Sequence, residues 1–470
     1  MDYIGIMGTV PDARLFSFPP SSVPTPLAPT PTATSILRPF NIPEPIYQAA
    51  LDARVPVVIA ALYAATAKAC NIYNLSRNKK PWAISKTRVF KAFVILHNIF
   101  LAVYSAWTFI GMGSAMIRGV QSPFGPEGLA GTADSLCRLH GAPGLGNSIY
   151  YNEVTGSWES TAQDAAFQNG LPSATQTGRL WNEGLSYYGW IFYLSKFYEV
   201  LDTFIILAKG KPSSTLQTYH HAGAMICMWA GMRYMAIPIW VFVVYNSFIH
   251  TLMYTYYTLT AFSVKVPTIV KRSLTTMQIM QFLIGASYTM LHSFISYTVP
   301  VTVPISKDNS ADSVPAGSAI DAIKNLVFRG TPNTVVGQNN ATSSGSGPAL
   351  SAVQPCILTT GETYAIWMNV VYLAPLTYLF VSFFIASYLK RSNASGKLAN
   401  GKRTTLDRRL SNNVTMAEKA GWDAARGVER EVYGQGANKT DSDESAVATE
   451  DDTPVAKKGK GKGKSRRAKA

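Results

Sequence analysis

Apolar residues are gathered into long blocks along this chain instead of being spread at helix or strand period. Each block is long enough to cross roughly 30 Å of hydrocarbon as a helix of about 20 residues. The pattern predicts an all-α fold, a polytopic membrane bundle of about seven transmembrane helices. The blocks lie at roughly 51–73, 90–117, 184–208, 214–233, 236–262, 274–300 and 363–389, the fourth and fifth separated by a tight turn.

Polar and proline-rich sequence flanks this region and sets the expected domain limits. Residues 1–47 are rich in proline, lack the basic start and apolar run of a signal peptide, and are expected to be disordered. The first apolar block is then an uncleaved anchor, and residues 48–390 form the transmembrane domain. Residues 391–470 are expected to be a disordered basic tail, and 339–350 a flexible low-complexity loop.

The net charge of +15 is unevenly placed along the 470 residues. Basic residues cluster after the first, third, fifth and seventh blocks, while the long connections 118–183 and 301–362 hold few. The positive-inside rule therefore predicts a non-cytosolic N-terminus and a cytosolic C-terminus. A basic tail behind membrane spans marks the cytosolic side and contacts anionic lipid, so nucleic acid is not an expected partner.

Polar residues inside apolar helices are the candidates for chemistry. An ionisable residue at mid-membrane costs about 2.5–3.5 kcal/mol or more, so its presence points to function. The spacing in the third block places Lys196, Glu199, Asp202 and Thr203 on one helix face. An internal salt bridge that only neutralises buried charge is the alternative reading of this cluster.

Three further blocks carry polar stripes. The adjacent pair His220 and His221 is hard to explain by packing, whereas a single histidine such as His292 is expected to be a core residue. Taken with the depth expected from the topology, these groups and His97 of the second block converge on one layer open to the cytosol. The other stripe residues are Gln217 in the fourth block, Asn246, His250, Tyr254 and Tyr257 in the fifth, and Thr275, Gln278 and Gln281 in the sixth.

These clusters together resemble the fatty acid elongases of the endoplasmic reticulum, over roughly residues 50–390. The matching motifs are Lys196-x-x-Glu199-x-x-Asp202-Thr203, His220-His221, Asn246-x-x-x-His250-x-x-Met253-Tyr254-x-Tyr256-Tyr257 and Thr275-x-x-Gln278-x-x-Gln281. The family box commonly begins with histidine, and Gln217 stands there instead. This Gln-x-x-His-His variant looks like that of elongases acting on polyunsaturated chains, within a fungal-type member of the family.

The resemblance implies a 3-oxoacyl-CoA synthase that joins a malonyl-CoA-derived unit to an acyl-CoA and supplies very-long-chain and sphingolipid precursors. It implies that His220 and His250 carry acyl transfer through an acyl-imidazole, with His221, Asn246 and Gln278 as orienting groups. Glu199 and Asp202 would set tautomers and charge, and Lys196 would balance them. No bound cofactor or metal is expected; the expected partners are both CoA substrates, membrane lipid, the reductase and dehydratase of the elongation cycle, and a second copy of the chain.

Two rival functions stay open from the residues. A membrane di-iron desaturase or hydroxylase also uses histidine pairs, but it takes more histidine ligands than the six in this chain. A seven-span receptor explains the span count and the outside N-terminus, but not the buried polar layer.

The four cysteines follow the predicted topology. Cys70 and Cys227 lie in apolar blocks and are expected to be free thiols. Cys137 and Cys356 lie in the two long loops on the expected lumenal side, where the compartment favours disulfides, so we predict a bridge between them. Asn340 begins an Asn-Ala-Thr glycosylation acceptor that is usable only in the lumen.

Overall fold

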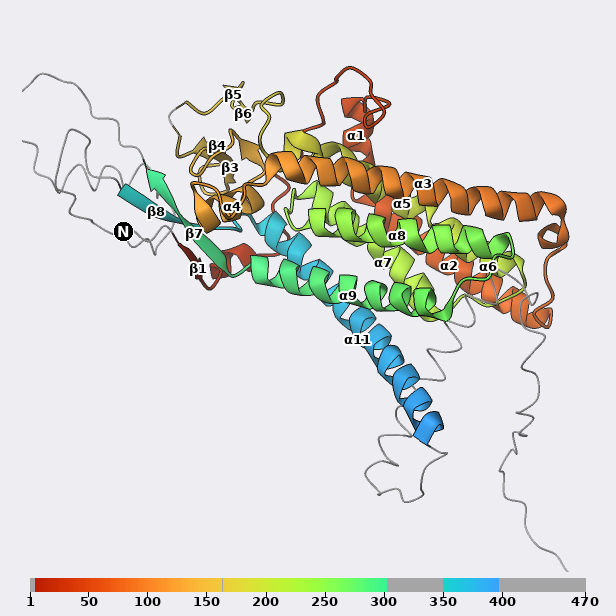
Figure 1. The fold of residues 1–470 in the computed structure, drawn as a ribbon. Coiled ribbons are helices and arrows are strands. Elements are labelled where there is room, and N and C mark those ends of the chain that lie inside the picture. The colour runs from red at the N-terminus through yellow and green to blue at the C-terminus, as the bar shows by residue number, and fades with distance from the viewer. Residues whose placement is uncertain (1–4, 163, 302–349, 397–470) are drawn as a thin grey trace, which may run out of the picture. The chain divides into compact units, whose positions relative to one another are not determined.

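A computed structural model describes residues 5–162, 164–301 and 350–396. These residues are mostly helical, and Figure 1 shows the long helices running side by side. The helices are α1 (Glu44–Ala50), α2 (Arg54–Ser76), α3 (Arg88–Gly119), α4 (Gly128–Cys137), α5 (Ser186–Tyr198), α6 (Val200–Ala208), α7 (Thr215–Arg233), α8 (Ile239–Ala261), α9 (Thr268–His292) and α11 (Thr360–Gly396).

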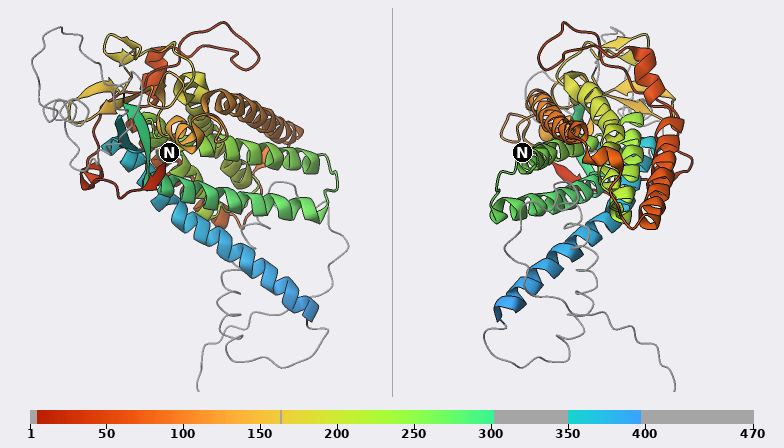
Figure 2. Two further views of the ribbon diagram at one scale, coloured as in Figure 1. Left: turned by 60° about the vertical axis from the view of Figure 1, so that its left-hand side comes forward. Right: turned by 90° about the vertical axis from the view of Figure 1, so that its right-hand side faces the viewer.

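The long helices form one bundle in which α3 packs along α8, α2 along α7, and α11 against α9 and α7. The turned views in Figure 2 show the same grouping, with α11 running obliquely out of the bundle. Helices α2 and α3 are long and apolar enough to cross a membrane, with mean hydropathies of 1.5 and 1.7. Their outward faces carry large apolar side chains such as Leu62, Leu96 and Val103, which suits contact with lipid.

Local sequence explains where the helices near the polar layer begin. The Thr87 hydroxyl caps α3 by accepting a hydrogen bond from the Phe90 N–H at 3.1 Å. Ser214 caps α7 in the same way by accepting from the Gln217 N–H. Because the cap fixes the first turn of α7, it also fixes the direction in which Gln217 and His220 leave the helix.

An all-α architecture is not the whole fold, because within the described residues eight short strands build three small sheets at one end of the bundle (Figure 1). One sheet has the order β1-β7-β8, another β2-β3-β4, and the third β5-β6. The strands are β1 (Ile6–Gly8), β2 (His140–Gly141), β3 (Ser148–Asn152), β4 (Ser157–Ser160), β5 (Phe167–Gln168), β6 (Leu171–Pro172), β7 (Ile295–Val301) and β8 (Leu350–Pro355).

The helix of the sixth apolar block ends earlier than the sequence predicts. The block is expected to be helical to residue 300, but α9 ends at His292 and β7 begins at Ile295. The sequence Ile-Ser-Tyr-Thr-Val-Pro-Val is rich in β-branched residues, which favour an extended backbone. It pairs antiparallel with β1 on one side and β8 on the other, so two distant segments fix its conformation.

The predicted disorder of the proline-rich N-terminal segment is also wrong for residues 5–43. These residues lie along the bundle, and many of their carbonyl oxygens accept hydrogen bonds. This backbone has few helix or strand partners, so side chains of the bundle satisfy it instead. The donors are Trp107 to Ile36, Trp181 to Leu27, Tyr187 to Phe40, Tyr188 to Leu37, and Arg233 to Pro24 and Ser22.

A disulfide joins Cys137, at the end of α4, to Cys356, directly after β8. This is the pairing that the sequence predicts, while Cys70 and Cys227 are free thiols. The buried guanidinium of Arg138 donates to the carbonyl oxygens of Cys137 and Cys356, so both ends of the bridge share one cation. The glycosylation acceptor at Asn340, the loop 339–350 apart from its last residue, and the tail after residue 396 lie outside the described residues.

The disulfide predicts a specific pattern of thiol labelling. It spans 219 residues, for which the loop-entropy estimate of its stabilisation is about 5 kcal/mol. Because the bridge is covalent, it should persist in denaturant until a reductant is added. Alkylation of denatured, unreduced protein should modify two cysteines, and alkylation after reduction should modify four, as read by intact mass. Four modified cysteines without reductant would rule the bridge out.

Candidate active site

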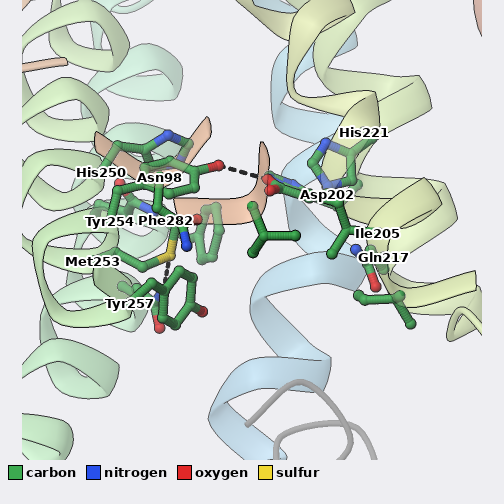
Figure 3. Close-up of a pocket in the computed structure, with 15 residues that line it drawn as sticks. Asn98, Asp202, Ile205, Gln217, His221, His250, Met253, Tyr254, Tyr257 and Phe282 are labelled. Carbon is green, nitrogen blue, oxygen red and sulfur yellow. Dashed lines mark hydrogen bonds between the residues drawn. The ribbon is translucent and has the colours of Figure 1, made fainter. Parts of the chain in front are cut away.

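A cavity of about 150 Å³ lies inside the bundle between α3, α6, α7, α8 and α9. Figure 3 shows side chains of α8, including His250 and Tyr254, facing His221 and Asp202 across it. Nearly all of the polar stripe residues reach this cavity or touch a residue that does. It is lined by Val94, Asn98, Asp202, Ile205, Ile206, Gln217, His220, His221, His250, Met253, Tyr254, Tyr257, Gln278, Gln281 and Phe282.

The charges of the third apolar block are paired where the helix breaks between α5 and α6. Lys196 and Glu199 are both almost fully buried, and the Lys196 ammonium donates to Glu199 Oε1 at 2.6 Å. The same ammonium donates to Asn246 Oδ1 of α8 at 2.9 Å. The ion pair therefore neutralises both charges and also reaches across to the helix that carries His250.

This contact fixes the orientation of Asn246 and, through it, the tautomer of His250. An ammonium only donates, so the oxygen of the Asn246 amide must face Lys196 and its NH₂ must face His250. Asn246 Nδ2 lies 3.1 Å from His250 Nε2, which therefore accepts a hydrogen bond. In the neutral ring the proton is then on Nδ1, which lies 3.7 Å from Glu199 Oε1.

Asp202 organises a second polar group one turn further along. Its Oδ2 accepts from the Tyr254 hydroxyl, and its Oδ1 lies 2.8 Å from His97 Nε2. His97 Nδ1 lies 3.3 Å from the Tyr198 hydroxyl. One carboxylate thus holds an imidazole of α3 and a phenol of α8 against the cavity wall.

Thr203 departs from the expected common face. Its hydroxyl lies 2.8 Å from that of Tyr63 on α2, on the side of α6 away from the cavity. The reason is geometric: Thr203 follows Asp202 directly, and consecutive helix residues point about 100° apart. Only Asp202 of the two reaches the cavity.

The histidine pair of α7 lies on the opposite wall from α8. The two rings are 5.4 Å apart, and His221 also meets the edge of the Tyr63 ring at 6.2 Å. His220 contacts the ring of Phe282 on α9, and its Nδ1 lies 3.0 Å from the hydroxyl of Tyr372 on α11. Both histidines therefore face the cavity with supporting side chains behind them.

Amide groups complete the wall. Gln281 Oε1 accepts from Asn246 Nδ2 at 3.5 Å, and Gln278 Nε2 donates to Met253 Sδ at 3.3 Å. Gln217 lines the cavity one helical turn before His220, and Tyr257 lies beside Tyr254 on α8. Thr275 donates to the Lys271 carbonyl of its own helix instead of reaching the cavity.

The sequence motifs miss part of the site. His97 and Asn98 have a detectable signal, because they are polar residues inside an apolar block, yet they belong to none of the four motifs. Tyr372 has no such signal, because a tyrosine in an apolar helix is common at packed interfaces. Its contact with His220 depends on how α11 crosses α7.

One group of the described residues brings three potential metal-ligand atoms within 4.8 Å: Cys137, His292 and Cys356. The sulfurs of Cys137 and Cys356 form the disulfide, so neither is a thiolate that could bind a metal. His250 in the cavity wall and His97 behind Asp202 are engaged by carboxylate, amide and phenol groups. The polar atoms described there are arranged to hydrogen-bond one another.

Comparison with known proteins gives partial matches to named elongases. The chain is 34% identical to very long chain fatty acid elongase 3 of Homo sapiens over 110 residues, which is 23% of this chain and 41% of that protein. It is 28% identical to putative fatty acid elongase 2 of Schizosaccharomyces pombe over 135 residues, 28% of this chain and 36% of that protein. It is 32% identical to fatty acid elongase 2 of Trypanosoma brucei brucei over 108 residues, which is 23% of this chain and 40% of that protein.

The aligned stretches thus cover less than half of each of these relatives. No solved structure matches the chain. The family model for the GNS1/SUR4 family, ELO, matches residues 49–396, which include every helix around the cavity. This chain therefore belongs to the ELO (GNS1/SUR4) family and is a helical membrane protein.

Proposed function

We propose that this chain is the condensing enzyme of a fatty acid elongation cycle, a 3-oxoacyl-CoA synthase that uses acyl-CoA and malonyl-CoA. The observation that carries the proposal is one cavity lined by both His220 of α7 and His250 of α8, each with a polar partner in place. Family membership and the elongase relatives support the same activity.

The proposed reaction has two steps, and both balance without a cofactor. In the first, His220 Nε2 attacks the thioester carbonyl, the C–S bond breaks, an N-acylimidazolium that keeps the ring proton forms, and the CoA thiolate takes up a proton from the solvent. In the second, malonyl-CoA loses CO₂ and its enolate carbon attacks the acyl group. The imidazole is released, and the products are 3-oxoacyl-CoA, CO₂ and CoA.

His220 is a better nucleophile than His250 in the described geometry. The Nε2 lone pair of His250 already accepts from Asn246, whereas the contact of His220 with Tyr372 uses Nδ1 and leaves Nε2 to the cavity. We therefore assign His250, with Asn246, to the malonyl half of the reaction, where the Nδ1–H of the neutral ring stabilises the enolate oxygen.

We further propose that seven helices span the membrane of the endoplasmic reticulum, with a lumenal N-terminus and a cytosolic C-terminus. The α2–α3 and α6–α7 connections meet at one end of the bundle, where the backbone N–H of Trp82 donates to the backbone carbonyl of Ala208. These connections carry Lys79, Lys80, Lys209 and Lys211, which suits the cytosolic face. The disulfide and the small sheets lie at the other end, which suits the lumen (Figure 1).

The activity is tested by supplying membranes that contain the protein with labelled malonyl-CoA and a panel of acyl-CoAs. The expected product is a labelled chain longer by two carbons, absent from membranes without the protein. If no acyl-CoA gives a labelled product at a normal protein level, the proposal is wrong and a binding role for the cavity is favoured.

Replacing either proposed catalytic histidine should remove condensation. In His220→Ala and His250→Ala we expect the rate to fall by at least about 100-fold, because positioned imidazoles contribute about 10²–10⁴. Protein level and membrane insertion should be unchanged. A matched control is His292→Gln, since His292 lies at the end of α9 away from the cavity. Wild-type product yield from one alanine variant would remove that histidine from the mechanism.

Gln217→His should keep activity and change the acyl preference. Position 217 lines the cavity one turn before His220, and either side chain donates a hydrogen bond into the same space. The measurement is the product ratio from competing saturated and polyunsaturated acyl-CoAs. Loss of all activity at normal expression would show that the glutamine supplies something that histidine does not.

The orientation predicts where sugar is added. Asn340 should be glycosylated when the chain is inserted into microsomes, and Asn340→Gln should remove the glycosidase-sensitive mass shift. The native acceptors of the tail, Asn393, Asn413 and Asn438, should stay unmodified if the tail is cytosolic. Sugar on the tail and none at Asn340 would invert the topology and move the open side of the cavity to the lumen.

A further inference from the structure

The hydroxyl of Tyr372 makes two contacts with one residue of the histidine pair. It lies 2.8 Å from the backbone carbonyl oxygen of His220 and 3.0 Å from Nδ1 of the same residue. Tyr372 is on α11, more than 150 positions along the chain, and its side chain is almost fully buried. None of the four sequence motifs includes it.

The two contacts together determine which ring nitrogen of His220 carries the proton. A carbonyl oxygen only accepts, so the hydroxyl hydrogen of Tyr372 must point to it. The phenolic oxygen then has only lone pairs left for His220, and Nδ1 must be the donor. In the opposite arrangement, with the hydroxyl donating to Nδ1, two oxygens would face each other at 2.8 Å without a proton between them.

The packing around Tyr372 is built for this close approach. A Cβ at Gly223, on the turn of α7 after His220, would lie 2.1 Å from the Tyr372 ring, so only glycine leaves room for it. From the other side, the Tyr219 hydroxyl donates to the Tyr372 carbonyl at 3.2 Å, and the two rings are 5.4 Å apart. The ring is therefore held on both sides while its hydroxyl reaches His220.

We propose that Tyr372 is a positioning residue that locks His220 in the Nδ1–H tautomer and so keeps the Nε2 lone pair directed at the acyl group. The inference rests on the proposed function. Attack by Nε2 then gives an acylimidazolium that still carries the Nδ1 proton, and the thiolate leaves as before. The positive charge makes the imidazole a better leaving group when the enolate attacks.

The direct test is Tyr372→Phe, which keeps the ring and removes the hydroxyl. Losing a net hydrogen bond of ordinary strength should slow acyl transfer by about 3- to 10-fold while leaving the acyl-CoA KM within about twofold. The rate is read from CoA release in the absence of malonyl-CoA. The matched control is Tyr378→Phe, which removes an exposed hydroxyl from the same helix and should change nothing.

A second readout separates positioning from a structural role. Nitrogen-15 spectra of histidine-labelled protein distinguish protonated from bare ring nitrogens, and the His220 signals are identified by their loss in His220→Gln. The wild type should show a protonated Nδ1 and a bare Nε2, and Tyr372→Phe should show a mixture. Gly223→Ala, which displaces the ring without removing the hydroxyl, should produce the same mixture if Tyr372→Phe fails to fold.

The possible outcomes are distinct. A wild-type acylation rate in Tyr372→Phe, or a slower rate with an unchanged tautomer, overturns the positioning role even if His220→Ala is inactive. An active His220→Ala instead overturns the nucleophile assignment, and with it the reason for a tautomer lock. A slower acylation step together with a mixed tautomer and an unchanged KM supports the proposal.

Discussion

The cost of burying charge in an apolar bundle is the constraint on which the site depends. Lys196 and Glu199 are each almost fully buried, and an unpaired charge at such a place costs several kcal/mol. Pairing them offsets part of that cost, but the remaining donors of the ammonium still need partners. Asn246 supplies one, and through it the ion pair orients His250 on a different helix.

Asp202 also needs partners for its charge inside the bundle, and His97 and Tyr254 supply them. Two carboxylates on consecutive turns thus hold polar groups from two neighbouring helices. Breaking either network would leave a charge inside the bundle without a partner, so the networks favour one relative placement of α3, α6 and α8. The apolar side chains pack these helices together, and the polar groups determine their register.

The other end of the bundle follows a related rule for backbone groups. The N-terminal segment has few regular partners for its carbonyl oxygens, and indole and phenol groups of the helices donate to several of them. The disulfide and Arg138 join the segments that enter this layer from α4 and β8. The cavity therefore lies between an end closed by covalent and polar contacts and an end formed by short basic connections.

The sequence alone determined the helical blocks and most of the polar layer, because a membrane helix needs a long apolar run and a polar residue within it stands out. It also predicted the pairing of Cys137 with Cys356 and the stripe of α8 that carries His250. Only the tertiary structure decided that residues 295–301 form a strand, that residues 5–43 are ordered, and that Thr203 faces α2 while Tyr372 reaches His220. Each of these depends on a partner far along the chain, and local composition carries no information about which distant donor, strand or ring will lie alongside.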